Sequence, residues 1–317
     1  MEVNEKIRRL TNRAKIAGEL LSLSEKKEGV TKNGIPYVSF GGEVACDEAG
    51  IVKIKFKTFE TAKNRNGDNE NYKNVIKWYD EACSKEMRIK EAEEKNLEEP
   101  LPATMVTIAG SLTDNLFVNR ENKLIEGFQY NLKYFSPFKE YLAQVDIEGY
   151  IYSIVDEVKG EEETPTGRMR MRLISMDGFG NVMSLNSLVI PSDLVDSLDE
   201  VGWENGATVS VAIDVLPSSR PKTVKTSGFG KQHTVDGPIY SELVVVGGEN
   251  ACDPDGERAI TPAQVKAMLA ERKNKIDTTV AEGYLGNSTA TSNRAGFGAK
   301  KAQQKDDFTV DDEDIPF

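Results

Sequence analysis

Short segments in which apolar and polar residues alternate constrain the fold of this chain more than any other feature. From the stretch "YVSFGGEVAC" onward, these segments are rich in Val, Ile, Phe and Tyr and are separated by Gly and Asn, a pattern typical of β-strands. The alternation predicts two sets of five strands. The first set lies near residues 36–46, 51–59, 72–79, 104–112 and 127–135, and the second lies near residues 146–156, 168–176, 181–190, 207–216 and 239–247.

A helix is predicted before the fourth strand of each set. In the first set it covers "EACSKEMRIKEAEEKNLEEP", where Glu86 and Lys90 stand four residues apart in the favourable order. In the second set it covers "PSDLVDSLDEV", where Pro191 and Asp193 suit a helix start. Five strands with one helix before the fourth is an order typical of the OB fold, a small five-stranded barrel.

Helices are also predicted on either side of the strands. Apolar residues between Ile7 and Leu21 recur at spacings of three and four, which predicts an amphipathic helix over residues 1–24. The stretch "TPAQVKAMLAERKNKI" predicts a second helix, with Thr261 as N-cap and Pro262 at the first helical position. The residues that follow are rich in Gly, Ser, Thr, Asn and Ala, a composition too polar to order itself.

The predicted fold class is therefore mainly β, with two tandem OB-fold-like five-stranded barrels, flanking helices and a disordered acidic C-terminal tail. The domains are an N-terminal helical lead-in (1–30), a first OB-like domain (31–140), a second OB-like domain (141–250), a C-terminal helix (251–276), a flexible linker (277–305) and an acidic protein-interaction tail (306–317).

Composition makes an enzyme the weaker hypothesis. The chain has one histidine, His233, and three scattered cysteines, and it carries no phosphate-binding loop, nucleophile elbow or metalloprotease motif. We therefore predict no catalytic activity, no cofactor and no metal site. No apolar run is long enough to span a membrane, and the first residues lack the apolar stretch of a secretory signal. The expected location is the cytoplasm, or the host cytoplasm if the protein is viral, with no membrane partner.

Two of the predicted strands alternate cations with apolar residues. In "VKIKFKTF" the period of two places Lys53, Lys55 and Lys57 on one face. In "RMRMRL" it does the same for three arginines. Like charges on one face repel, so an anion is expected to lie across them, and OB folds bind oligonucleotides on their second and third strands. The alternative is that these are ordinary solvent-facing positions, where Lys and Arg discourage edge pairing.

Aromatic residues near these strands would stack on bases. We favour Phe229, which lies in a basic loop between the fourth and fifth strands of the second set, and Tyr72 over Trp78, because aromatics in strands more often pack in the core. The predicted residues that bind single-stranded DNA are Lys53, Lys55, Lys57, Phe59, Lys63, Arg65, Tyr72, Lys73, Lys77, Trp78, Arg168, Arg170, Arg172, Arg220, Lys222, Lys225, Phe229 and Lys231.

The overall charge of the chain opposes this interpretation. The net charge is -12, whereas nucleic-acid binders often have a strongly basic domain. Six carboxylates lie in residues 306–317, so the remaining residues still sum to -6. Binding to DNA therefore requires that the cations gather on one face and the acids elsewhere, and it should depend on salt.

The stretch "DDEDIPF", residues 311–317, resembles the C-terminal tip of bacterial single-stranded DNA-binding proteins. In that family an acidic run ends in Ile-Pro-Phe after a disordered linker, and the tip docks replication, recombination and repair enzymes. The resemblance implies that Phe317 fills a pocket on the partner, with the carboxylates facing a basic rim. Glu313 stands where the family more often has Asp. The implied partner-binding residues are Asp311, Asp312, Glu313, Asp314, Ile315, Pro316 and Phe317.

The sequence favours a non-enzymatic protein that coats and protects single-stranded DNA with little sequence preference and recruits replication, recombination or repair proteins through its tail. The two predicted barrels depart from the bacterial type, which has one barrel per chain, so a single-stranded DNA-binding protein of bacteriophage type with a host-like tip is the nearest description. An acidic adaptor that mimics a host tail without binding DNA tightly is the alternative, and a carboxylate-dependent, metal-using nuclease is a third hypothesis. Self-association is left open.

Overall fold

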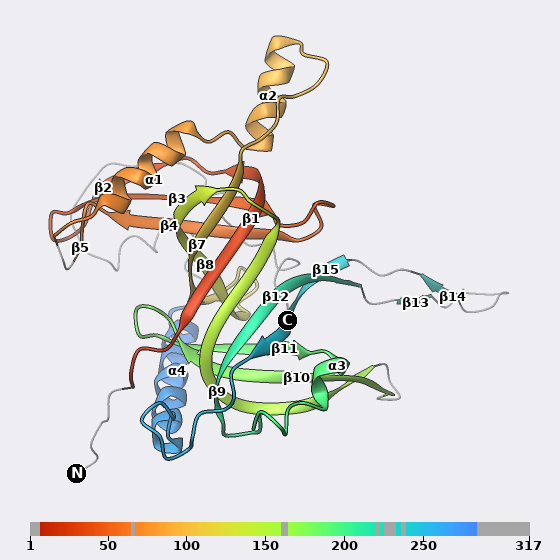
Figure 1. Cartoon of the computed structure of the whole chain (residues 1–317). Coiled ribbons are helices and arrows are strands. Elements are labelled where there is room, and N and C mark those ends of the chain that lie inside the picture. The colour runs from red at the N-terminus through yellow and green to blue at the C-terminus, as the bar shows by residue number, and fades with distance from the viewer. Residues whose placement is uncertain are drawn as a thin grey trace.

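The computed structural model describes residues 7–64, 67–159, 164–219, 222–224, 233–235 and 239–283, and it is mainly β (Figure 1). The strands are β1 (Asn12–Leu23), β2 (Lys27–Val30), β3 (Pro36–Ala45), β4 (Lys53–Thr61), β5 (Lys63–Asn64), β6 (Gly67–Asp68), β7 (Met105–Val118), β8 (Leu124–Pro137), β9 (Leu142–Lys159), β10 (Thr164–Met176), β11 (Val182–Ile190), β12 (Thr208–Ser219), β13 (Lys222–Val224), β14 (His233–Val235) and β15 (Ile239–Gly248). The helices are α1 (Glu70–Glu81), α2 (Lys85–Lys95), α3 (Ser192–Val195) and α4 (Pro262–Glu282).

Strands β1, β3, β4, β7 and β8 pair in a closed ring, which we call the first barrel. β1 pairs antiparallel with β3 and β7, β3 with β4, and β7 with β8. A short parallel pairing of β4 with β8, at Phe56 and Tyr130, closes the ring. The interior holds fully buried side chains such as Leu20, Phe56 and Leu132.

Strands β9, β10, β11, β12 and β15 form a second ring of the same pattern, the second barrel. β9 pairs antiparallel with β10 and β12, β10 with β11, and β12 with β15. A parallel contact of β11 with β15, at Val189 and Val244, closes it. Ile151, Met171 and Leu173 are fully buried in this barrel.

The first strands of the two barrels pair with each other. Residues Asn12 to Ala17 of β1 lie antiparallel to Ile147 to Leu142 of β9, so in the described part of the chain eleven strands form one hydrogen-bonded sheet. At Gly18 the strand β3 crosses β1 so closely that a Cβ atom would lie 1.7 Å from the carbonyl oxygen of Ala45. Only glycine can stand there.

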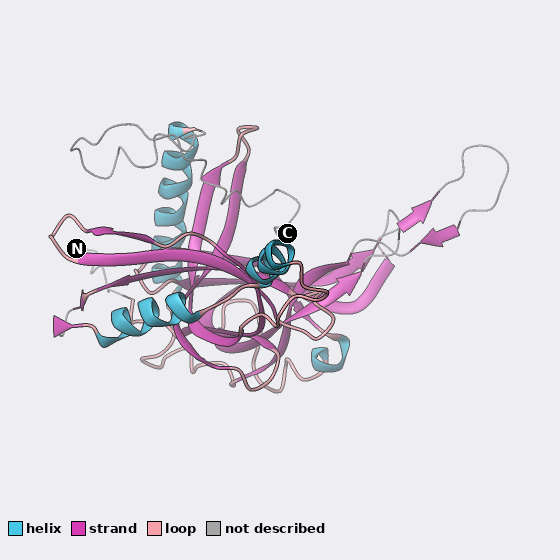
Figure 2. Ribbon diagram, turned by 90° about the horizontal axis from the view of Figure 1, so that it is seen from above, coloured by secondary structure: helices cyan, strands magenta, loops and turns pink. Residues whose placement is uncertain are grey.

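The helices lie outside the two rings. α2 projects from the end of the first barrel, and α4 runs alongside the second barrel (Figure 1). The side chain of Thr261 accepts a hydrogen bond from the backbone N–H of Gln264 in a capping box, which confirms the predicted start of α4. The small sheet of β13 and β14 lies apart from both barrels, as the view from above also shows (Figure 2).

A buried ion cluster attaches α4 to both barrels. The Arg272 guanidinium of α4, with a side chain only 3% exposed, lies 2.9 Å from a carboxylate oxygen of Asp114 on β7 and 2.8 Å from one of Glu126 on β8. It also donates to the carbonyl oxygen of Val182 on β11, at 2.8 Å. Lys275 approaches Asp114 to 2.7 Å. The helix therefore holds the β7 and β8 hairpin of the first barrel against the second.

The predicted N-terminal helix is wrong, because residues 12–23 form β1. Ile16, Ala17 and Gly18 are buried in succession, since β1 has neighbours on both sides and is covered on both faces there. This burial removes the period of two that identifies a half-buried strand, and a short apolar run of this kind cannot be told from a buried helix.

The strand predicted at residues 72–79 is also wrong, because these residues lie in α1. The helix begins where the Asn69 side chain accepts a hydrogen bond from the backbone N–H of Asn71. The residues it packs against the core include Tyr72, Val75 and Tyr79, at helical spacing. Because β1 is the first strand of the first barrel, β4, predicted as its second strand, is the third in the ring.

The other nine predicted strands and the helices before the fourth strands are confirmed, although several strands extend further than predicted. The predicted C-terminal helix is also confirmed, and it continues to Glu282, so the first residues assigned to the linker are helical. The rest of the linker and the acidic tail lie outside the described residues.

Candidate nucleic-acid interface

The outer face of β4 carries the row of lysines predicted from the sequence. Lys53 and Lys57 are exposed and Lys55 is half-buried, whereas Ile54 and Phe56 between them are buried in the first barrel. The three lysines therefore share one face, as predicted. In the pairing of β3 with β4, Glu43 stands opposite Lys55 and Gly41 stands opposite Lys57.

A pair of aromatic rings continues the lysine row along the same strands. Phe59 of β4 is 45% exposed, and its ring stacks on that of Tyr37 of β3, with centroids 5.2 Å apart and planes inclined by 29°. Tyr37 was not among the predicted site residues. The alternation of Tyr37 with Val38 and the pairing of its strand with β4 were the signals that could have found it. Two ring faces beside a row of cations are the elements that single-stranded nucleic acid binds.

The aromatic residues of α1 serve the core of the first barrel. The ring of Trp78 stacks on that of Phe135 at 3.9 Å and lies 6.1 Å from that of Phe40. Tyr72 is partly buried against the same core. The predicted contact of these two residues with DNA stays a prediction, and their packing counts against it.

The remaining predicted lysines of this region are exposed. Lys73 and Lys77 lie on α1, where the Lys77 ammonium is 4.0 Å from a carboxylate oxygen of Glu81. Lys63 lies on β5.

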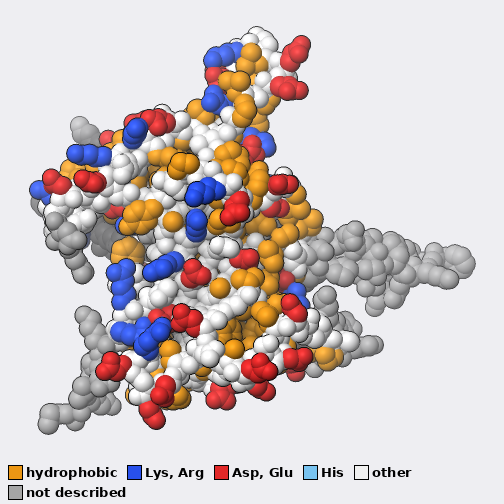
Figure 3. Space-filling view, in the orientation of Figure 1, with side chains coloured by type: hydrophobic (Ala, Val, Ile, Leu, Met, Phe, Trp, Pro, Cys, Tyr) orange, Lys and Arg blue, Asp and Glu red, His pale blue; other side chains and the backbone are white. Residues whose placement is uncertain are grey.

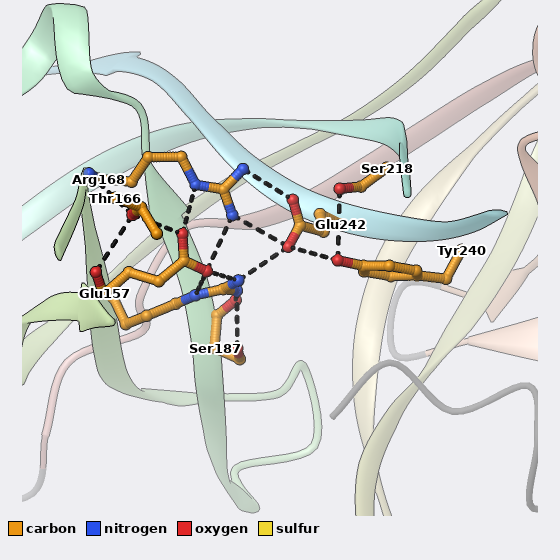
Figure 4. A network of polar contacts seen from close by, with 8 residues as sticks. Glu157, Thr166, Arg168, Ser187, Ser218, Tyr240 and Glu242 are labelled. Atoms are coloured by element: carbon orange, nitrogen blue, oxygen red, sulfur yellow. Dashed lines mark hydrogen bonds and ion pairs between the residues drawn. The ribbon is translucent and has the colours of Figure 1, made fainter. Parts of the chain in front are cut away.

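The arginines of β10 are bound to carboxylates of the second barrel (Figure 4). Arg168 contacts Glu157 of β9 at 2.7 Å and Glu242 of β15 at 3.1 Å. Arg170 forms ion pairs with the same two carboxylates, at 2.8 Å to Glu242, and donates to the Ser187 hydroxyl at 3.0 Å. Two guanidinium groups and two carboxylates thus neutralise each other.

The network keeps both carboxylates charged. Burial alone would raise the pKa of Glu157, but hydrogen bonds from Arg168 and Arg170 outweigh it and lower the pKa to about 2. The pKa of Glu242 is lowered in the same way against its burial. The prediction of an uncompensated cationic face is therefore wrong for Arg168 and Arg170, because the anion across them belongs to the protein. The contact of Arg168 and Arg170 with DNA stays a prediction. Their pairing with Glu157 and Glu242 counts against it.

Arg172 has a different environment from the other two arginines. Its guanidinium lies over the Tyr152 ring, 4.7 Å from the centroid, and its Nε donates to the Ser184 hydroxyl at 3.1 Å. The cation is thus held on the outside of β10 by a ring and a hydroxyl group. Because Tyr152 is 45% exposed, this pair remains accessible.

Several predicted site residues lie outside the part of the chain that the structure describes. They are Arg65, Arg220, Lys225, Phe229 and Lys231, the side chain of Lys222 on β13, and the whole of the tail from Asp311 to Phe317.

Three further questions about the described residues concern a metal site, a membrane-spanning helix and a reactive thiol. Among them no three His, Cys, Asp or Glu side chains converge in a way that could hold a metal ion. No helix in the described ranges has the length and apolarity needed to cross a membrane. Burial raises the pKa of the Cys46 thiol to about 12, which makes it an inert core residue.

The sequence model of the YorF family matches residues 11–282, and the chain belongs to this family. No curated protein sequence matches it. Among solved structures, the single-stranded DNA-binding protein from Thermus aquaticus is similar in two forms. A deletion mutant with a further substitution has 12% identity and a TM-score of 0.43, covering 78% of this chain and 98% of that chain. The wild-type protein has 12% identity and a TM-score of 0.41, covering 79% and 97%. Likeness at this level is too low to carry an inference about function.

Proposed function

We propose that this protein binds single-stranded DNA without catalysing a reaction, and that each ring of five strands is an OB-type barrel. The proposal is supported by the order of the strands. In each ring the first strand pairs with the second and the fourth, and the third and fifth close the ring in parallel. In OB folds the second and third strands bind oligonucleotides.

The observation that carries the proposal is the outer face of β3 and β4, the second and third strands of the first barrel. This β4 face consists of Lys53, Lys55 and Lys57 together with the stacked rings of Tyr37 and Phe59. The lysines supply contacts to phosphates, and the rings supply platforms for bases of any sequence. Binding with little sequence preference follows from such contacts, because they read no base edges.

The two barrels contribute unequally in this proposal. The strands of the second barrel that correspond to β3 and β4 are β10 and β11, where Arg168 and Arg170 already bind Glu157 and Glu242. Releasing a guanidinium to a phosphate would leave a carboxylate in a largely buried site without its partner, which is costly. These two arginines of the second barrel are therefore expected to contribute little to DNA binding.

The substitution Phe59→Leu tests the stacking contact. It removes the ring but keeps an apolar side chain on the strand. We expect oligo-dT to bind more weakly by about 1 to 3 kcal/mol, the usual contribution of one stacked base. The slope of log affinity against log salt should not change, because no charge is lost. Fluorescence anisotropy with labelled oligo-dT, measured over a range of salt concentrations, provides both quantities.

Phe179→Leu is the matched control, because Phe179 is 76% exposed in the turn between β10 and β11, away from the β4 face. It should bind as the wild type does. Wild-type affinity in Phe59→Leu would contradict the stacking contact. Absence of salt-dependent binding by the wild type would favour the adaptor instead, and magnesium-dependent loss of the oligonucleotide would favour the nuclease.

The proposal includes recruitment of replication, recombination or repair enzymes through residues 311–317. It is supported only by the resemblance of "DDEDIPF" to the bacterial tip. Deleting these seven residues is expected to abolish binding to a purified enzyme that recognises that tip, whereas oligo-dT should bind as well as before or more tightly, because an anionic segment competes with DNA for cations. Isothermal titration with the full chain and the truncated chain measures the first effect. Equal binding of the enzyme by both would refute the assignment.

A further inference from the structure

A second exposed face of the molecule lies where the two barrels meet. Strands β8, β7, β1, β9 and β12 lie side by side in this order. Figure 3 looks onto this side of the molecule and shows a group of Lys and Arg side chains over the start of β1, whereas Asp and Glu predominate along the lower edge. The face is distinct from the β4 face.

Two cations of β1 point outward on this face. Arg13 and Lys15 are exposed, whereas Ala14 and Ile16 beside them are buried, so the two cations lie on the same side of the strand, about 7 Å apart at two residues of strand. In the part of the chain that the structure describes, neither side chain forms a hydrogen bond or an ion pair with another residue. Arg13 stands opposite Asp146 in the pairing of β1 with β9, but the two side chains form no ion pair. This contrasts with Arg168 and Arg170, which are fully paired.

An exposed aromatic ring shares the register of these cations. Lys15 stands opposite Ala109 of β7, and Ala109 stands opposite Tyr134 of β8. Directly opposite residues of antiparallel strands lie on the same face, and Tyr134 is 53% exposed. The Lys133 ammonium lies 5.6 Å from the centroid of its ring. Ala109 thus lies between the exposed ring of Tyr134 and the ammonium group of Lys15. Because its side chain is small, the surface between the two protrudes little.

Carboxylates limit this face on one side. Asp146 of β9 is exposed, and Asp214 of β12 stands opposite Gln144, which itself stands opposite Lys15. The side toward the second barrel is therefore acidic, and the side toward the first barrel is cationic and aromatic. A polyanion would be repelled from β9 and β12 and held along β1, β7 and β8.

We propose that Arg13, Lys15 and Tyr134, the β1 track, bind the sugar-phosphate backbone and one base of the same single-stranded DNA that the β4 face binds. Arg13 and Lys15 contact successive phosphates, and a base stacks on Tyr134. This inference rests on the proposed function and extends it to a surface outside the second and third strands of either barrel. The path of the DNA then continues from the first barrel onto the junction of the two barrels.

The double variant Arg13→Gln, Lys15→Gln tests the track. With an oligo-dT long enough to cover both surfaces, the slope of log affinity against log salt should fall by about 1.4, or 0.7 for each lost phosphate contact. The counterion contribution vanishes at 1 M salt, so the two proteins should bind equally there. Over the tenfold decrease to 0.1 M salt, the change in slope lowers the affinity of the variant about 25-fold relative to the wild type. Tyr134→Leu should lower affinity at least about fivefold with the slope unchanged.

The control variant is Lys90→Gln, Lys266→Gln, which removes two exposed cations from α2 and α4 and changes the net charge equally. Its slope should equal that of the wild type. The inference is overturned if the wild type binds DNA, the β4 face variants weaken binding, and Arg13→Gln, Lys15→Gln behaves as this control does. Failure of the proposed function itself would look different, because the wild type would then show no salt-dependent binding. A thermal melt of each variant verifies that these outward-facing substitutions leave the fold intact.

Discussion

Replacing Lys53, Lys55 and Lys57 together by Gln is expected to weaken binding of oligo-dT about 100-fold at 0.1 M salt. Each lysine that contacts a phosphate releases counterions, so the slope of log affinity against log salt should fall by about 2 in total. The stability of the protein should change little, because the three side chains lie on the outside of the first barrel. Anisotropy titrations at several salt concentrations measure the affinity and the slope together.

The matched control replaces three other exposed lysines, Lys90, Lys266 and Lys273, so that the net charge changes by the same amount. If the long-range field of the whole molecule drove binding, both triple variants would weaken it equally. If the β4 face binds DNA, only the first does so. An unchanged slope in the first variant would rule out phosphate contacts by these lysines.

Arg272→Met is expected to lower the free energy of unfolding by about 3 kcal/mol, because it leaves a buried carboxylate without its main partner. Asp114 is only 1% exposed, so water cannot replace the guanidinium. The value lies at the lower end of the usual range because Lys275 still reaches Asp114. Methionine fills a similar volume, so a cavity contributes little. Urea unfolding followed by circular dichroism measures the change.

Lys273→Met on the next residue of α4 is the control. The side chains of Lys273 and Asp277 are 77% and 62% exposed and lie 3.4 Å apart, and such surface pairs contribute about 0 to 1 kcal/mol. Adding Asp114→Asn to Arg272→Met should restore part of the lost stability, because it removes the uncompensated charge. Equal effects of Arg272→Met and Lys273→Met would show that the buried cluster does not hold α4 in place.

The fold was predictable wherever a strand has one buried face. β4 alternates along its whole length, and β10 alternates in sequence from Arg168 to Leu173, and both were predicted on residue patterns alone. β1 was missed because Ile16, Ala17 and Gly18 are buried together between the two barrels, a consequence of pairing between segments far apart in sequence. α1 was missed because its aromatic residues are those that strands favour. The two errors offset each other, since one strand was lost and another gained, so the count of five survived.

The candidate site was predictable in part for the same reason. Alternation places Lys53, Lys55 and Lys57 on one face without any knowledge of the fold. It could not reveal that Glu157 and Glu242 lie across Arg168 and Arg170, because these carboxylates come from β9 and β15. Arg13 and Lys15 were missed with β1 itself. Once that segment is a strand, the period of two places them on one face.

The ladder between β1 and β9 determines how the protein can engage a long ligand. When two binding domains are joined by a flexible linker, the second domain binds at an effective concentration that is set by the length of the linker. Here the two barrels are joined directly by six consecutive residue pairs of an antiparallel strand pairing, from Asn12 with Ile147 to Ala17 with Leu142. The fold therefore fixes the separation of the two barrels, so under the proposed function the length of DNA that bridges them would be set by geometry and not by chain entropy.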